Sequence, residues 1–112
     1  MKYLMFVCVD EALVTPESTK DMPRDTSAWV EEMDGRGVRL QGNRLQELST
    51  ATTVRVRGGE VVLADGPFAE TKELIAGFDI IDCADLDEAI EVAGKHPVAR
   101  IGSIEVRPFW ED

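Results

Sequence analysis

This sequence is poor in the residue types that most often carry metal or nucleophilic chemistry. Its 112 residues include two cysteines, Cys8 and Cys83, and a single histidine, His96. Both cysteines lie inside apolar runs and not at a metal-type spacing, so we expect reduced thiols in the core. Neither a phosphate-cradling glycine loop nor a calcium-loop spacing is present. We therefore expect no bound metal and no cofactor.

The single histidine follows the second predicted helix and directly precedes Pro97. A histidine in such a position is expected to be a solvated helix end in preference to a catalytic base. Serine chemistry lacks a base placed beside it, and neither cysteine has the surroundings of a recognisable nucleophile.

Long apolar runs and excess positive charge are also missing. The longest nearly uninterrupted apolar run, Tyr3 to Val9, is far shorter than the ~20 residues of a membrane helix, and no basic stretch precedes it. The formal net charge of -10 argues against binding to nucleic acid, whose phosphates attract basic surfaces. We expect an acidic, soluble, cytoplasmic protein with no membrane and no nucleic acid as partner, folded as one domain over residues 1–112.

The periodicity of apolar residues predicts an α+β fold. An apolar run over residues 2–9 predicts a strand whose two faces are both covered. Residues 10–20 are expected to form a loop, and a helix is expected to begin near Asp21 and to end at Gly35 or Gly37. The remaining predicted elements are a strand at 38–45, a hairpin formed by 52–57 and 60–64, a strand at 77–83, a helix that begins after Asp85, and a strand at 103–109.

Each predicted helix has an apolar stripe at helical spacing. In the first helix the stripe consists of Met22, Thr26, Trp29, Val30 and Met33. In the second helix it consists of Leu86, Ala89, Ile90 and Ala93. Asp85 as N-cap, with Glu88 three residues later, is typical of a capping box. Two helices on one face of an antiparallel sheet form the ferredoxin-like βαββαβ arrangement, here with an inserted β-hairpin. Because the first strand is apolar on both faces, we expect a second subunit on the open face, in a homodimer.

The segment from Asp65 to Glu73 combines turn formers with a high density of charge. Gly66 and Pro67 interrupt regular structure. Phe68 is an apolar anchor for the charged residues that follow it. With residues 77–81, 85–90 and 102–108, this segment resembles the DGPF-motif family of YCII-related proteins. The resemblance implies a ferredoxin-like subunit that pairs into a dimeric α+β barrel.

Two roles are open for the acidic residues of this segment. Partial burial and neighbouring like charges would make Asp65 and Glu70 proton acceptors, and thus candidate catalytic residues. Asp65 would otherwise cap the turn through backbone N–H groups. The candidate binding residues are Phe68, Lys72, Glu73 and Arg107. Arg107 shares a strand face with Glu105, so an ion pair between them is expected in preference to a ligand clamp.

Three hypotheses for function follow. The first is a homodimer with a small pocket in each subunit that binds or transforms a small organic molecule without a cofactor. In the second, the protein is a noncatalytic regulatory or interaction protein whose 65–73 loop is a structural clasp at the dimer interface. In the third, the protein is a degradative or stress-linked accessory protein whose activity needs a partner chain. The pocket is inferred from the resemblance to dimeric α+β barrels, several of which enclose one.

Overall fold

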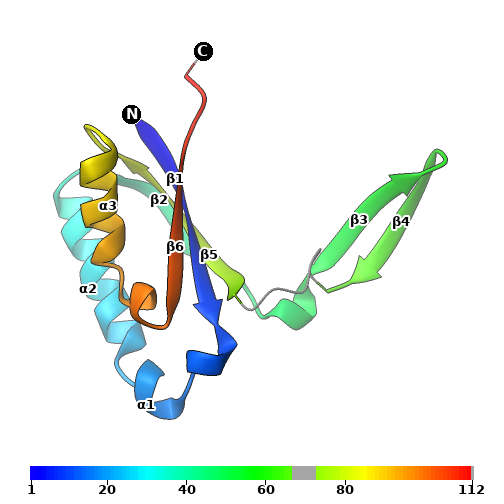
Figure 1. Ribbon diagram of the computed structural model, residues 1–112, viewed down its shortest axis with the longest axis horizontal. Coiled ribbons are helices and arrows are strands. Elements are labelled where there is room, and N and C mark those ends of the chain that lie inside the picture. The colour runs from blue at the N-terminus through cyan, green and yellow to red at the C-terminus, as the bar shows by residue number, and fades with distance from the viewer. Residues whose placement is uncertain (67–72, 112) are drawn as a thin grey trace.

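The computed structural model describes residues 1–66 and 73–111. A four-stranded sheet carries its helices on one face, and a separate two-stranded hairpin projects away from it (Figure 1). The strands are β1 (Lys2–Asp10), β2 (Arg39–Arg44), β3 (Thr52–Arg57), β4 (Glu60–Asp65), β5 (Glu73–Asp82) and β6 (Gly102–Pro108). The α-helices are α1 (Pro16–Thr19), α2 (Met22–Gly35) and α3 (Leu86–Gly94), and short 3-10 helices occupy Glu11–Leu13, Leu48–Thr50 and Pro97–Arg100.

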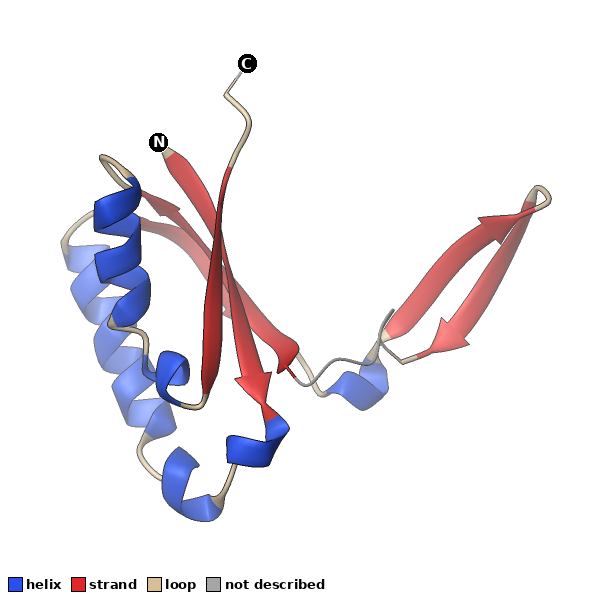
Figure 2. Ribbon diagram, in the orientation of Figure 1, coloured by secondary structure: helices blue, strands red, loops and turns tan. Residues whose placement is uncertain are grey.

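The strands of the main sheet lie in the order β2-β5-β1-β6, and every neighbouring pair is antiparallel. Helices α2 and α3 cover one face of this sheet, and no helix of the described residues covers the opposite face (Figure 2). This arrangement confirms the predicted α+β, ferredoxin-like fold with an inserted hairpin.

The core lies between the covered face of the sheet and the two helices. Alternation along β1 directs Tyr3, Met5 and Val7 into this core, as expected for a strand with a side-chain period of two. From α2, Trp29 is buried and its indole N–H donates a hydrogen bond to the carbonyl of Val92 in α3, at 2.9 Å. A buried indole N–H is usually paired in this way, so the bond fixes how the two helices pack.

Helix α2 starts and stops where the sequence predicts. Asp21 is the N-cap residue, and a proline stands in the first turn, where its missing N–H costs no helical hydrogen bond. At the other end Gly37 has a φ of 72°, a left-handed conformation that glycine adopts without strain. The N–H groups of Gly37 and Val38 donate to the carbonyls of Asp34 and Met33, at 3.0 Å and 3.1 Å. These two bonds form a Schellman motif, which explains why the chain leaves the helix here.

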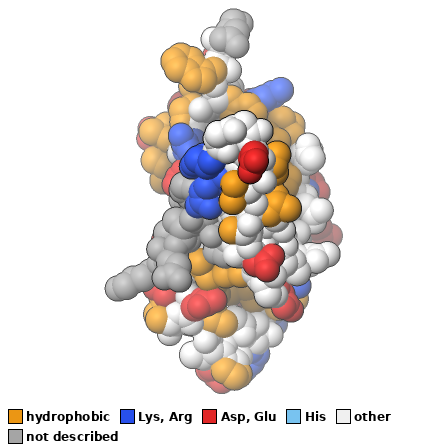
Figure 3. Space-filling view, turned by 90° about the vertical axis from the view of Figure 1, so that its right-hand side faces the viewer, with side chains coloured by type: hydrophobic (Ala, Val, Ile, Leu, Met, Phe, Trp, Pro, Cys, Tyr) orange, Lys and Arg blue, Asp and Glu red, His pale blue; other side chains and the backbone are white. Residues whose placement is uncertain are grey.

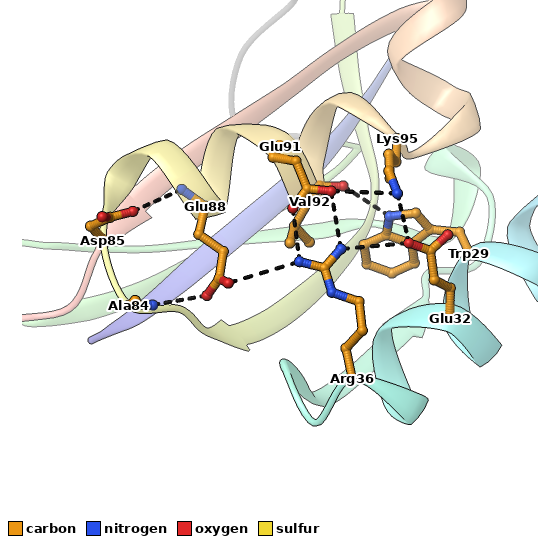
Figure 4. A network of polar contacts seen from close by, with 9 residues as sticks. All are labelled: Trp29, Glu32, Arg36, Ala84, Asp85, Glu88, Glu91, Val92 and Lys95. Atoms are coloured by element: carbon orange, nitrogen blue, oxygen red, sulfur yellow. Dashed lines mark hydrogen bonds and ion pairs between the residues drawn. The ribbon is translucent and has the colours of Figure 1, made fainter.

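Charged side chains connect the exposed sides of α2 and α3 (Figure 4). The guanidinium of Arg36 forms two hydrogen bonds with the carboxylate of Glu91, at 3.0 Å and 2.8 Å. One turn earlier on α2, Glu32 accepts a hydrogen bond from the ammonium of Lys95 at 2.8 Å. Since the fork of an arginine matches a carboxylate in geometry, the Arg36 pair orients the two helices as well as neutralising charge.

The hairpin of β3 and β4 is amphipathic, and its apolar face is uncovered. Val54 lies opposite Leu63 and Val56 opposite Val61, so these four side chains share one face. Each is between 59% and 66% exposed. Figure 3, seen from the hairpin side, shows hydrophobic side chains gathered beside basic ones. The radius of gyration, 15.8 Å, exceeds the ~13 Å of a compact chain of this length because the hairpin projects outward.

Three expectations from the sequence are wrong. The segment 10–20 is not a plain loop, since it contains α1, where Thr15 and Ser18 form a capping box. On α3, Leu86 and Ile90 are 51% and 56% exposed, and Val92 takes their place in the core. Helix α3 meets the sheet through Ala89, Val92 and Ala93, so its buried stripe is rotated from the predicted one. His96, expected in solvent, is buried, as described below.

Candidate functional site

The candidate site begins at the base of the hairpin. Gly66 has a φ of 95°, and its N–H donates to the carbonyl of Ala51 at 2.8 Å. The hydroxyl of Thr53 donates to the carbonyl of Gly66 at 2.7 Å. Both bonds close the hairpin at the point where the chain leaves it, and the positive φ explains the need for glycine. Gly66 therefore has a structural role.

Of the four predicted site residues next to this glycine, the structure describes only Asp65. Asp65 is exposed at the end of β4, opposite Thr52, and no described residue forms a hydrogen bond with its carboxylate. Phe68, Glu70 and Lys72 lie outside the described residues. The roles predicted for all four therefore remain predictions.

Glu73 opens β5 and lies beside the last strand on the open face of the sheet. Its carboxylate accepts a hydrogen bond from the hydroxyl of Ser103 at 2.7 Å, and Ser103 lies opposite Cys8. Burial raises the pKa of the Cys8 thiol, and the charges of Glu73 and Glu105 raise it further. The structure thus brings Glu73 and Glu105 to one region of the sheet. The thiol between them stays protonated, which is unfavourable for a nucleophile.

Arg107 stands further along β6, and its guanidinium lies 3.6 Å from the carboxylate of Glu105. Both side chains are exposed. The ion pair expected from their spacing is therefore present, and in solvent it stabilises the fold by little. Its position on the open face leaves the guanidinium available to a ligand or to a second subunit.

A hollow of about 980 Å³ is lined in β5 by Leu74, the residue after Glu73, and by the two residues that follow it. Its walls come from the end of β1, the chain after β2 and the start of β5. The lining residues are Val9, Glu11, Val14, Arg44, Leu45, Gln46, Glu47, Leu48, Ser49, Thr50, Leu74, Ile75 and Ala76. Apolar walls with a few convergent polar groups are typical of small-molecule sites, and this volume lies within their usual range of about 300–1,000 Å³.

A buried ion pair lies on the covered face of the sheet, where the sequence offered no explanation for Asp79. The guanidinium of Arg39 donates to the Asp79 carboxylate at 2.9 Å and to the carbonyl of Gly42 at 3.2 Å. Burial raises the pKa of Asp79, and Arg39 opposes this rise. A Cβ at Gly42 would collide with the Asp79 carboxylate. We interpret this pair as structural, since every group in it is engaged.

His96 is the second buried polar residue, with an exposed fraction of 4%. Its ring lies 4.7 Å from that of Trp29, and its Nδ1 accepts the N–H of Val98 at 3.1 Å. Burial lowers the pKa of His96 to about 4, so the ring is neutral at physiological pH. The sequence feature that could have indicated the burial of His96 is the apolar Val98 after Pro97, because Val98 is buried and holds this turn against the core.

Two absences bear on the chemistry of the site. Within the described residues, no group of three or more His, Cys, Asp or Glu side chains is placed to hold a metal ion. No helix in residues 1–66 and 73–111 is long and apolar enough to cross a membrane.

A comparison with solved structures finds a protein with a similar fold. A solved structure with TM-score 0.55 and 14% identity covers 100% of this chain and 96% of its own. It is the 5-chloro-2-hydroxyhydroquinone dehydrochlorinase of Burkholderia phenoliruptrix AC1100 in complex with 2,5-dihydroxybenzoquinone. At this identity the likeness shows the fold alone.

Sequence comparison gives a closer relationship. An uncharacterized protein of Rhizobium meliloti (strain 1021) is 43% identical over 101 residues, which covers 75% of this chain and 82% of the relative. The model of the YCII-related domain matches residues 1–111. The chain therefore belongs to the YCII-related family.

Proposed function

We propose that this protein is a cytoplasmic homodimer that binds or transforms a small organic molecule, without a cofactor, in the hollow beside Glu73. The observation that carries the proposal is the hollow itself, about 980 Å³ with mixed apolar and polar walls. The structural neighbour of the same fold holds a small quinone. Its likeness supports small-molecule binding by analogy of fold. The free thiols of Cys8 and Cys83 suit a reducing compartment.

Two uncovered apolar surfaces support the homodimer. On the open face of the main sheet, Leu4, Phe6, Phe78 and Ile80 are only half-buried although they occupy the two central strands. The apolar face of the hairpin is the second surface. An isolated two-stranded hairpin is marginally stable in water, so a partner that covers it also stabilises it. Stable dimer interfaces bury about 1,200–2,000 Å² in total, and both surfaces are available to contribute to such an area.

In this proposal Asp65 and Glu70 accept protons, and Phe68, Lys72 and Glu73 bind the ligand. Arg107, the remaining candidate binding residue, lies opposite Leu4, toward the other end of β1 from the hollow that Val9 lines. Glu73 suits a binding role because Ser103 fixes its carboxylate at 2.7 Å. A carboxylate held in a fixed position can orient a hydroxyl or amine of a ligand.

A screen of metabolites by thermal unfolding tests the proposal. A ligand at 100 times its dissociation constant stabilises the folded state by about 2.7 kcal/mol, which raises the melting temperature measurably. Asp65→Asn should abolish the response while leaving stability unchanged or raised, and Glu60→Gln, at the far end of β4, should respond as wild type does. No response from the wild-type protein to any compound would refute the pocket. A stable folded monomer at micromolar concentration in the ultracentrifuge would refute the dimer.

The alternative is a noncatalytic regulatory or interaction protein whose 65–73 loop is a structural clasp at the dimer interface. The hydrogen bonds of Gly66 to Ala51 and Thr53 lie within one chain and give Gly66 the structural role that a clasp needs. In that case Asp65→Ala should lose about 0.5–2 kcal/mol, the cost of losing a side-chain cap, and Asp65→Asn much less. Urea unfolding of the two variants distinguishes the alternatives. A loss in the alanine variant alone, with no ligand response in wild type or either variant, would leave the clasp.

A further inference from the structure

A second hollow, of about 410 Å³, lies between α2 and the turn that follows α3. Its lining residues are Asp25, Ala28, Trp29, Glu32, Gly94, Lys95, His96, Pro97 and Arg100. None of them lines the hollow beside Glu73, so the two sites are separate. The function proposed above makes no use of this second hollow.

His96 forms part of the wall and has a defined protonation state. Its Nδ1 accepts the N–H of Val98, so this nitrogen presents a lone pair and carries no proton. A neutral imidazole that accepts at Nδ1 bears its hydrogen on Nε2. Burial lowers the pKa of the ring, which agrees with this neutral tautomer. Nε2–H is therefore a hydrogen-bond donor.

This donor has no partner among the described residues. The hydrogen bonds of His96 are those of Nδ1 and of the backbone, although its side chain is almost fully buried. Every fully buried nitrogen or oxygen of the described side chains has a partner. Nε2 must therefore reach the surface, and the hollow is the surface that His96 lines. Water in the hollow meets this donor, and a ligand that enters the hollow can offer it an acceptor in place of that water.

The charged residues around the hollow indicate whether it favours a charged or a neutral ligand. Arg100 pairs with Asp25 at 2.9 Å, and Lys95 pairs with Glu32 at 2.8 Å. Two bases and two acids cancel, so the rim does not select for an anion or a cation. The uncharged walls come from Ala28, Trp29, Gly94 and Pro97.

We propose that this hollow binds a small neutral carbonyl compound, an amide or a ketone, whose oxygen accepts the Nε2–H of His96. The ligand replaces the solvent that otherwise meets this donor. His96 thereby has two roles, because Nδ1 caps the 97–100 turn while Nε2 recognises the ligand.

Because the chain has a single histidine, NMR spectroscopy can follow the site directly. Long-range ¹H–¹⁵N correlation should show a neutral ring with the proton on Nε2. Benzamide, used as the probe, should shift the His96 resonances in a saturable manner, with a dissociation constant in the millimolar range expected of such a small ligand. A proton on Nδ1, or no saturable shift up to the solubility limit of benzamide, overturns the proposal.

Two variants test separately whether binding needs the Nε2–H donor and whether it needs the volume of the hollow. Because H96N removes the histidine resonances, binding is followed by the amide resonance of Gly94. H96N keeps an acceptor for the Val98 N–H, since asparagine is a good N-cap, and is too short to present a donor in the hollow. It should weaken benzamide binding about three- to tenfold, the effect of one lost neutral hydrogen bond. A28L, on an exposed position of α2 that lines the hollow, should narrow the hollow and weaken binding.

The control variant is E31Q, which lies on α2 outside the hollow and should bind as wild type does. Unchanged binding by H96N would show that Nε2 is not the donor. Unchanged binding by A28L would place benzamide elsewhere. Either result overturns the proposal. Unfolding curves of all three variants establish that each is folded before it is titrated.

Discussion

Burial of the single histidine should make the stability of this protein depend on pH in a way that one substitution removes. The pKa of His96 falls from 6.5 to about 4 on folding because burial disfavours the charged ring. Between these values the unfolded chain binds a proton that the folded chain does not. The stabilising contribution is therefore complete above pH ~6.5 and is lost as the pH falls toward ~4.

The size of the effect follows from the two pKa values. Lowering the pH from about 7.5 to about 5 should reduce the free energy of unfolding by about 2 kcal/mol through His96 alone. Carboxylates with lowered pKa, namely Asp25, Glu32 and Glu91, add smaller losses that H96N shares. The quantity to measure is therefore the difference between wild type and H96N.

Urea unfolding of both proteins at the two pH values gives this difference. A constant offset in stability of the variant does not matter, because only its change with pH is tested. We expect the wild type to lose about 2 kcal/mol more than H96N. Parallel losses in the two proteins would refute the reasoning, since they would show that His96 titrates alike in both states.

Three further predictions concern the core. Arg39→Met leaves the Asp79 carboxylate buried without its partner and should lower the free energy of unfolding in urea by about 3–5 kcal/mol, whereas R39M combined with D79N should recover most of this loss. An equal loss in both variants would contradict a paired charge. Gly42→Ala forces a Cβ against the Asp79 carboxylate and should cost about 1–3 kcal/mol; wild-type stability would contradict the close approach. Cys83, whose pKa burial raises to about 11, should resist alkylation in the native protein, while both it and Cys8 react after unfolding without reductant; an intact mass lower by two hydrogens would reveal a disulfide.

The sequence predicted those parts of the fold that depend on local pattern. Asp21 and Gly37 bound α2, and the Gly58–Gly59 pair turns the hairpin, because caps and turns are encoded in neighbouring residues. The buried face of α3 was mispredicted at Leu86 and Ile90. Their side chains are apolar in the pattern, but the direction from which the sheet approaches the helix decides which residues it covers, and that direction is a tertiary property.

The candidate site was less accessible to sequence reasoning for a similar reason. Glu73 meets Ser103 across thirty residues, because β5 and β6 both pair with β1. The burial of His96 depends on its contact with Trp29, which comes from another helix. Neither contact has a local signature. What the sequence did supply was the residue types, such as the glycine at position 66 that its positive φ requires.

The separation of the hairpin from the main sheet has a consequence for how this chain can vary. Val54, Val56, Val61 and Leu63 contribute little to the packing of the subunit, because more than half of each side chain is in solvent. Substitutions there leave the core between sheet and helices intact. In the dimer proposed above, folding stability and the choice of partner would be controlled by different residues, and a duplicated copy of the chain could diverge in what it assembles with while its own fold stays constant.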